Sequence, residues 1–285
     1  MIFGFLALGM IGLLLAVGVW LSLTLTHRYF LTEIQTPADF GLAFEEVPFL
    51  AADGLRLCGW WIPAPGSDRA VIILHGHGGS MDMDVHRAPA LHAAGFNVLL
   101  FDFRAHGRSE GKQITFGYLE RRDVQGAVAF LRSRGMRRIG LLGFSLGGIV
   151  AVLSAPLCPE VAAVVTDGGP IRMRTAAAVR GIEWGFPAWV SRPMAWLAIA
   201  VTCVRLRANL FRYEAVHWVG RIAPRPILFI HGDRDQYCPD FDDLYAAAGS
   251  PKELWRVPEA GHTTLSSIVP EEHRQRVISF FQRHL

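Results

Sequence analysis

Residues 138–156 constrain the fold of this chain more than any other stretch. An apolar run at 139–142 meets Gly143-Phe-Ser145-Leu-Gly147, and a segment of small, uncharged residues follows. This order predicts a buried strand, a very tight turn and a buried helix, with Ser145 at the tip of the turn. Glycine is expected at 143 and 147 because a Cβ there would collide as strand and helix close on each other.

A second serine has the same glycine spacing. Gly107, Ser109 and Gly111 match the pattern, but polar loop residues follow them rather than a helix that could pack under a sheet. The flanking strand and helix are what give the motif its meaning, so Ser145 is the predicted nucleophile and Ser109 the weaker candidate.

Apolar strands and helices alternate along most of the chain. The expected strands are 45–50, 55–62, 70–74, 97–101, 139–142, 161–165, 226–230 and 254–257, and expected helices include 85–94, 119–134 and 270–284. The first two strands read as a hairpin with Asp53-Gly54 at its turn. The alternation predicts an α/β fold with a mostly parallel, eight-stranded sheet flanked by helices and right-handed crossovers.

The turn at Ser145 is a nucleophile elbow, and with it the chain resembles the α/β-hydrolase family over about residues 45–285. Residues 75–77 (His-Gly-His) are similar to the family's His-Gly-x loop, and residues 102–109 to its Asp-x-Arg-x-x-Gly-x-Ser loop. The resemblance implies a serine, an acid and a histidine in that order, each on a loop at the carboxyl edge of the sheet. It also implies that Asp102 and Arg104 tie loops together below the site.

Two aspartates that follow the strand at 226–230 are candidates for the acid. The chain there reads His231-Gly-Asp233-Arg-Asp235, and its resemblance to the family's His-Gly-x-x-Asp form assigns the acid to Asp235. Asp233 would then stabilise the loop. Asp167 is a third candidate, because some relatives place the acid after the corresponding strand.

His262 is the predicted base because it follows both the last strand and the acid. Gly261 gives the loop freedom to turn the imidazole toward Ser145. With Nδ1 bonded to Asp235 and Nε2 facing the serine, His262 would take the serine proton and pass it to the leaving group. The other candidates are His217, His273 and His284. The last two are expected to be solvated in a charged terminal helix.

Backbone N–H groups of Leu146 and His77 are the expected donors to the negative oxygen of a tetrahedral intermediate. It is the N–H of His77 that matters, so its side chain is not predicted to be essential. The alternative is a glycine-rich turn that serves only the path of the chain.

Five residues close together also resemble a metal cluster: His75, His77, Asp82, Asp84 and His86. The dinuclear signature His-x-His-x-Asp-His would need aspartate and histidine where the chain has Gly79 and Ser80. No metal and no cofactor is therefore expected.

Residues 171–222 interrupt the alternation of strands and helices. The apolar run at 195–204 makes a poor membrane span, because arginines and a proline flank it on both sides. A helical cap over the carboxyl edge of the sheet is predicted instead. Trp184, Phe186 and Trp189 are its candidate substrate-binding residues, for acyl chains or aromatic rings; alternatively they seal the cap against the core.

Residues 1–26 contain no charged side chain, and about twenty apolar residues suffice to span a bilayer. No basic residue precedes the apolar core and no small-x-small cleavage site follows it, which favours an uncleaved transmembrane anchor over a signal peptide. By the positive-inside rule, Arg28 places the catalytic domain on the cytoplasmic side. Residues 27–44 are the predicted connector, and 45–285 the hydrolase domain.

Composition excludes several other classes of protein. A hydrophobic content of 51% with 19% charged residues is that of a globular chain, and a net charge of +3 from scattered basic residues does not suggest a nucleic-acid surface. The cysteines lie far apart without a CxxC pair, so no disulfide framework is expected. They are Cys58, Cys158, Cys203 and Cys238.

These features predict a serine hydrolase that cleaves carboxylic esters of small, partly apolar molecules through an acyl-enzyme. Thioester or peptide hydrolysis and acyl transfer remain open on the same fold. A different class of explanation is a catalytically silent hydrolase fold that acts as a binding or scaffold protein. The complete set of Ser145, Asp235 and His262 in the required order argues against it.

Overall fold

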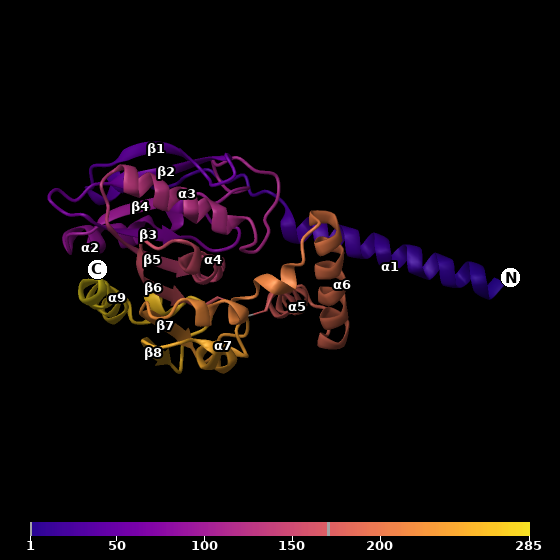
Figure 1. The fold of residues 1–285 in the computed structure, drawn as a ribbon. Coiled ribbons are helices and arrows are strands. Elements are labelled where there is room, and N and C mark those ends of the chain that lie inside the picture. The colour runs from indigo at the N-terminus through magenta and orange to yellow at the C-terminus, as the bar shows by residue number, and fades with distance from the viewer. Residues whose placement is uncertain (1, 170–171) are drawn as a thin grey trace.

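An eight-stranded sheet runs through the middle of the molecule, with helices on both of its faces (Figure 1). The computed structural model describes residues 2–169 and 172–285 and, within the first helix, the side chains of residues 9, 10 and 12–26. The strands are β1 Glu45–Leu50, β2 Arg56–Ile62, β3 Arg69–Leu74, β4 Asn97–Phe101, β5 Arg138–Phe144, β6 Val161–Asp167, β7 Ile227–Gly232 and β8 Lys252–Val257. The α-helices are α1 Ile2–Thr26, α2 Ala88–Ala93, α3 Glu120–Ser133, α4 Leu146–Ser154, α5 Met173–Glu183, α6 Ala188–Leu206, α7 Phe241–Ala247, α8 Leu265–Ile268 and α9 Pro270–His284.

The strand order is β1-β2-β4-β3-β5-β6-β7-β8. β2 pairs antiparallel with both β1 and β4, and every other neighbouring pair is parallel. The predicted fold class, a mostly parallel eight-stranded sheet flanked by helices, is thereby confirmed. Because β5 lies between β3 and β6, the loops that follow these strands meet at one edge of the sheet.

Apolar side chains alternate between the two faces of the sheet. On β3, Ile72 and Leu74 pack in a cluster with α3, α4 and α7, whereas Val71 and Ile73 pack in a second cluster with α2 and α9. A strand covered on both faces needs apolar residues at successive positions. This is why β3 and β4 read as unbroken apolar runs in the sequence.

The helix predicted over residues 85–94 is divided into two parts. A 3₁₀ turn, Met81–Arg87, leads into α2, and Pro89 lies in the first turn of α2. Proline lacks the N–H that an α-helix running through this position would need, whereas the first turn of a helix does not require it.

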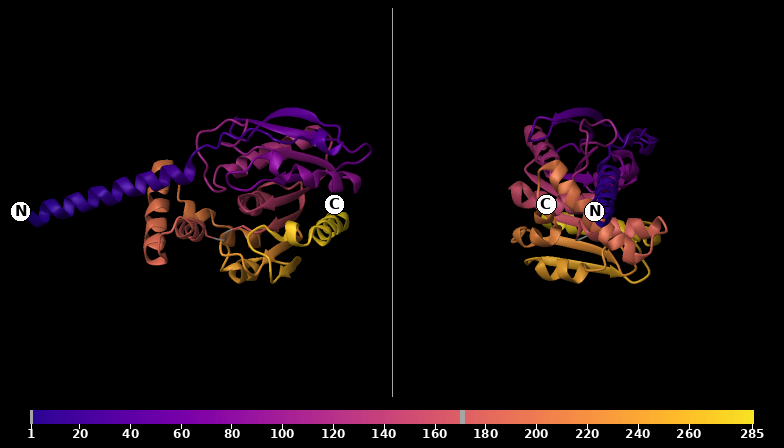
Figure 2. Two further views of the ribbon diagram at one scale, coloured as in Figure 1. Left: turned by 180° about the vertical axis from the view of Figure 1, so that it is seen from behind. Right: turned by 90° about the vertical axis from the view of Figure 1, so that its right-hand side faces the viewer.

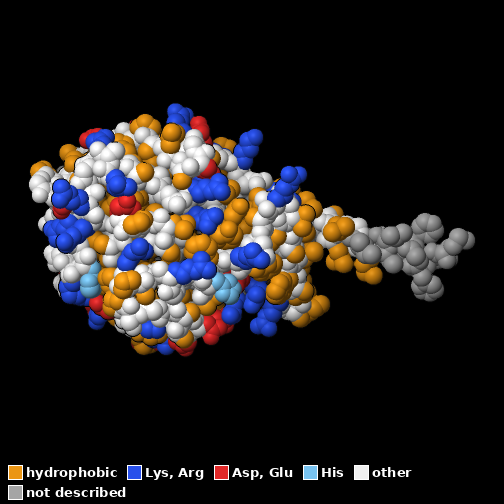
Figure 3. Space-filling model, in the orientation of Figure 1, with side chains coloured by type: hydrophobic (Ala, Val, Ile, Leu, Met, Phe, Trp, Pro, Cys, Tyr) orange, Lys and Arg blue, Asp and Glu red, His pale blue; other side chains and the backbone are white. Residues whose placement is uncertain are grey.

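Between β6 and β7 the chain forms α5 and α6, which lie with α1 at one end of the molecule (Figure 2). The last turns of α1 pack across α6, where a Cβ at Gly18 would already be 3.0 Å from Leu197 and Val201. The Ser22 hydroxyl lies 2.7 Å from that of Thr202, also on α6. Hydrophobic side chains remain exposed over α6 and along the described part of α1 (Figure 3).

The prediction of a transmembrane anchor at residues 1–26 is wrong, and with it the membrane localisation and the orientation drawn from Arg28. In the part of the chain that the structure describes, no helix is both long and apolar enough to cross a bilayer. The end of α1 instead belongs to the fold. Ser22 and Thr26 are buried there, and both hydroxyls accept hydrogen bonds from Arg205 of α6.

Candidate active site

Ser145 lies between the end of β5 and the start of α4. Its φ of 52° and ψ of −113° are outside the regions that ordinary residues occupy, so the turn is strained. A Cβ at Gly143 would be 2.3 Å from the carbonyl oxygen of Gly147, and one at Gly147 would be 2.0 Å from that of Leu74. Only glycine fits at both positions, because the atoms in the way belong to the backbone.

His262 lies between Ser145 and Asp235. The serine Oγ is 2.8 Å from His262 Nε2, and His262 Nδ1 is 2.9 Å from Asp235 Oδ2. Asp235 is buried, and its second oxygen accepts the backbone N–H of Tyr237 at 2.9 Å. With the Nδ1 proton donated to the carboxylate, Nε2 has a free lone pair for the serine proton.

The other candidate acids have different partners. The Asp233 side chain is 41% exposed and forms an ion pair with Arg256, at 3.3 Å from Oδ1 to Nε. Asp167 accepts a hydrogen bond of 2.9 Å from Nε2 of His273. Of the three aspartates singled out in the sequence, the structure brings only Asp235 to His262.

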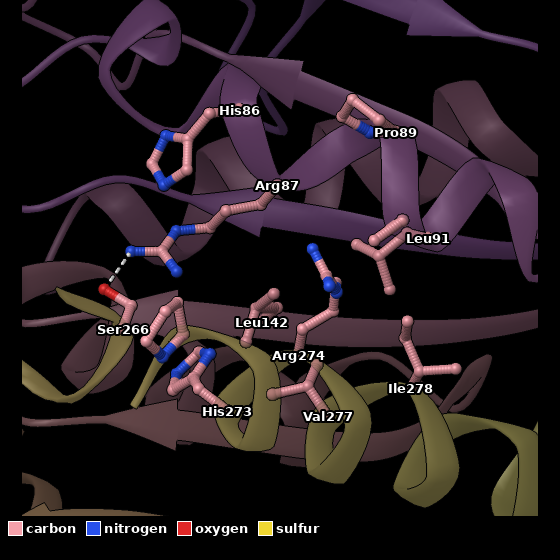
Figure 4. A pocket seen from close by; sticks show the side chains of 12 residues that line it. His86, Arg87, Pro89, Leu91, Leu142, Ser266, His273, Arg274, Val277 and Ile278 are labelled. Atoms are coloured by element: carbon pink, nitrogen blue, oxygen red, sulfur yellow. Dashed lines mark hydrogen bonds between the residues drawn. The ribbon is translucent and has the colours of Figure 1, made fainter. Parts of the chain in front are cut away.

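The prediction that His273 is solvated is wrong, because this residue is only 4% exposed. It lies on α9, facing Asp167 at the end of β6, where Trp255 of β8 packs beside it. His273 also lines a cavity of about 170 Å³ between α2 and α9 (Figure 4). The contact with Asp167 joins residues 106 positions apart, which a local sequence pattern does not reveal.

Ser109, the second serine with the glycine spacing, is buried away from His262. Its hydroxyl donates to the carbonyl oxygen of Asp102 at 2.6 Å and accepts the N–H of Cys58 at 3.0 Å. The first bond lies within the loop after β4, and the second joins that loop to β2. Asp102 itself accepts two backbone N–H groups through its carboxylate, consistent with the expected role in tying loops together.

His77 and Leu146, whose backbone N–H groups are the expected oxyanion donors, line the same cavity as Ser145. Neither N–H donates a hydrogen bond to another group among residues 2–169 and 172–285. An oxygen bound between them would therefore meet two free donors, which is what stabilisation of a developing negative charge requires.

A histidine that the sequence did not single out supports the loop of His77. His106 is completely buried, its Nδ1–H donates to the carbonyl oxygen of Arg104 at 3.0 Å, and its Nε2 accepts the N–H of Gly78 at 3.3 Å. Burial lowers the pKa of His106 to about 2, so Nε2 stays unprotonated and remains an acceptor. The sequence alone does not show that His106 is buried next to the His-Gly loop, because the contact joins segments 28 positions apart.

Among the described residues, no group of three or more histidines, cysteines or carboxylates is arranged to hold a metal ion. The side chains of the suspected metal cluster have other partners. His75 Nε2 accepts the N–H of Phe103 at 3.0 Å, and Asp84 pairs with Arg87 at 3.0 Å.

A cavity of about 290 Å³ opens beside Ser145. Its lining includes His262, the loop of His77 and a set of apolar side chains: Leu25, Phe116, Ile149, Met173, Ala176 and Ala177. Leu25 comes from α1 and the last three from α5, so segments outside the sheet form much of the wall. Burial against these groups lowers the pKa of the His77 imidazole to about 4.

The three aromatic residues predicted to bind substrate do not line this cavity. Trp184 and Phe186 border a smaller neighbouring cavity, and Trp189 is 79% exposed. The reason is their place in the chain. Arg180 of α5 reaches the site, whereas Trp184 follows one helical turn later, at the far end of α5.

The comparisons with known proteins agree with this geometry. A profile described as alpha/beta hydrolase family matches residues 71–280. The esterase Pf2001 of Pyrococcus furiosus has a similar structure, with a TM-score of 0.77 and 29% identity over 91% of this chain and 98% of that chain. The uncharacterized protein YfhR of Salmonella typhimurium is 30% identical over 263 residues, 88% of this chain and 84% of that protein.

The uncharacterized protein Rv2307c of Mycobacterium tuberculosis is 31% identical over 217 residues, 74% of this chain and 69% of that protein. The similarity to a solved esterase supports a hydrolase activity. The profile spans most of the sheet and includes Ser145, Asp235 and His262. Sheet topology, elbow and profile agree, and the chain belongs to the alpha/beta hydrolase family.

Proposed function

We propose that this protein is a serine hydrolase that cleaves carboxylic esters of small, partly apolar molecules through an acyl-enzyme. The observation that carries the proposal is the hydrogen-bonded line from Ser145 through His262 to Asp235, with distances of 2.8 and 2.9 Å. The esterase among the similar structures and the apolar lining of the adjoining cavity favour an ester as the substrate.

In the proposed mechanism, Ser145 Oγ attacks the carbonyl carbon of the ester and gives its proton to His262 Nε2. Asp235 stabilises the imidazolium that forms, and the N–H groups of Leu146 and His77 bind the negative oxygen of the tetrahedral intermediate. When the intermediate collapses, the bond to the alcohol breaks and the alcohol leaves with the proton from Nε2. Water then attacks the acyl-enzyme in the same way and releases the carboxylic acid.

Residues 171–222, which contain α5 and α6, are proposed to act as the cap that covers this reaction. Met173, Ala176 and Ala177 of α5 line the cavity beside Ser145. An enclosed, apolar site strengthens the hydrogen bonds to a developing charge, because fewer water molecules compete for the donors.

Covalent labelling with a fluorophosphonate tests the nucleophile directly. The wild-type protein is expected to be labelled, and Ser145→Ala to lose both the label and the turnover of p-nitrophenyl esters. Ser133→Ala is the matched control, because Ser133 is exposed on α3 and its hydroxyl only donates to the carbonyl oxygen of Phe130. A folded wild-type protein that is neither labelled nor active would refute the proposal and favour a binding or scaffold role.

A further inference from the structure

Two cavities meet beside Ser145. The cavity of about 290 Å³ next to the serine shares Leu25, Ala177 and Arg180 with a smaller one of about 30 Å³. The smaller cavity lies among α1, α5 and α6, away from the sheet. Because the same three residues line both, the two cavities adjoin each other. Together they are called the passage, which extends from the proposed nucleophile to the space between these helices.

Small residues keep the far part of this passage open. Its lining includes Gly181 of α5 and two alanines of α6, Ala195 and Ala198. A Cβ at Gly181 would lie 2.9 Å from the hydroxyl oxygen of Ser191, so α5 and α6 approach each other closely here. The passage is therefore narrow here, and apart from Arg180 and Ser191 the residues that line this part are apolar or glycine.

The N-terminal helix supplies the third wall. Leu21 and Leu25 of α1 line the far cavity, and α1 lies outside the region that matches the family profile. Hydrogen bonds between Ser22 and Thr202 and from Arg205 to Ser22 hold this helix against α6. This wall comes from the N-terminal segment and is fixed in place against α6.

The opposite side of Ser145 has a different character. A third cavity, of about 210 Å³, is lined there by the loop at residues 75–79 and by Asp84, Arg87 and Thr263. Charged side chains and backbone amides suit the alcohol part of an ester better than a hydrocarbon chain. The apolar passage is left for the acyl part.

We propose that the passage among α1, α5 and α6 binds the tail of an unbranched acyl chain and sets the chain-length preference of the enzyme. This inference rests on the proposed esterase function and names its substrate class. One water-sized probe needs roughly 10–15 Å³, so the far cavity holds about two or three methylene groups in a row and excludes rings and branched chains. Trp184, Phe186 and Met194 also line the far cavity.

The test compares kcat/KM for p-nitrophenyl esters from acetate to dodecanoate. Burial of each methylene raises kcat/KM about fourfold, so the far cavity contributes roughly 15- to 60-fold to the ratio of long-chain to acetyl ester. Ala177→Leu, at the junction of the two cavities, is expected to lower this ratio by that factor. Leu21→Trp blocks the same passage from α1 and repeats the test without changing α5. Thr175→Leu is the matched control, because Thr175 is half-buried on α5 and lines neither cavity.

Thermal melts of the full-length variants accompany the kinetics. A ratio that stays at the wild-type value in folded Ala177→Leu and folded Leu21→Trp would overturn the acyl passage, even with rapid hydrolysis of the acetate. A preference for branched or aromatic acyl groups in the wild-type protein would overturn it as well. Failure of the wild-type protein to hydrolyse any ester in the series would instead refute the proposed function on which the inference rests.

Discussion

Replacement of Asp235 by asparagine tests the geometry of the proposed triad most sharply. His262 Nδ1 lies 2.9 Å from Asp235 Oδ2, and Nε2 lies 2.8 Å from the Ser145 hydroxyl. An asparagine amide turned toward Nδ1 would donate a hydrogen bond to it. The imidazole proton would then reside on Nε2, which could no longer accept the proton of Ser145.

The expected loss in kcat for Asp235→Asn is about 10⁴-fold, the size found when a serine-protease triad is forced into the wrong tautomer. This corresponds to about 5.5 kcal/mol of transition-state stabilisation, at roughly 1.4 kcal/mol for each tenfold change. The fold should survive, because asparagine has the size of aspartate and its side-chain oxygen can still accept the N–H of Tyr237.

Asp233→Asn is the matched control for this variant. Asp233 lies two positions earlier on the same loop, is 41% exposed and pairs only with Arg256. An exposed pair of this kind contributes about 0.2–1 kcal/mol to stability, so turnover of p-nitrophenyl butyrate should stay near the wild-type value. If Asp233→Asn loses more activity than Asp235→Asn while both variants remain folded, the acid has been assigned to the wrong residue.

Three further outcomes are expected. In Gly147→Ala the new Cβ would lie 2.0 Å from the carbonyl oxygen of Leu74, so urea unfolding should show a loss of about 3 kcal/mol or more, and a wild-type midpoint would contradict the argument from the elbow. His106→Phe leaves the N–H of Gly78 without its acceptor and should lower the free energy of unfolding by about 1–3 kcal/mol in the same assay. An unchanged free energy of unfolding would show that this hydrogen bond does not stabilise the fold. Because the pKa of buried His106 is lowered to about 2, its contribution to stability is present above pH 6.5 and is lost as the pH falls from 6.5 toward 2, by about 1.4 kcal/mol per pH unit. His106→Phe should flatten that slope, and an identical pH dependence in both proteins would refute the assignment.

Local patterns were enough to predict the sheet. β3 and β4 are buried on both faces, so each reads as a continuous apolar run, and the hairpin of β1 and β2 turns at Gly54, whose φ is 82°. The elbow could also be predicted from the sequence, because strand and helix approach so closely that only glycine fits at 143 and 147. Each of these features depends on residues near to one another in the chain.

Local patterns were not enough where a residue's environment comes from a distant segment. An uncharged stretch such as residues 1–26 satisfies the composition of a membrane span, but its last turns pack against α6, and Ser22 lies 180 positions from its partner Thr202. The position of Trp184 depends in the same way on how α5 and α6 lie over the sheet. Neither contact leaves a periodic signal in the sequence.

Two aspartate–histidine pairs lie at the carboxyl edge of this sheet, and their different environments indicate different roles. The His273 side chain is 5% exposed, packs beside Trp255 and does not line the cavity beside Ser145. Its partner Asp167 accepts the backbone N–H of Ser145 at 3.1 Å through its own carbonyl oxygen.

The pair of Asp167 and His273 therefore holds β6 and α9 together directly behind the strained turn. His262, by contrast, has a side chain that is 21% exposed and lines the cavity beside Ser145, where it can exchange a proton with a bound ester. In the proposed mechanism one pair transfers the proton and the other keeps the serine in place. Asp167→Asn should consequently lower the melting temperature, whereas Asp235→Asn should lower kcat at a nearly unchanged melting temperature.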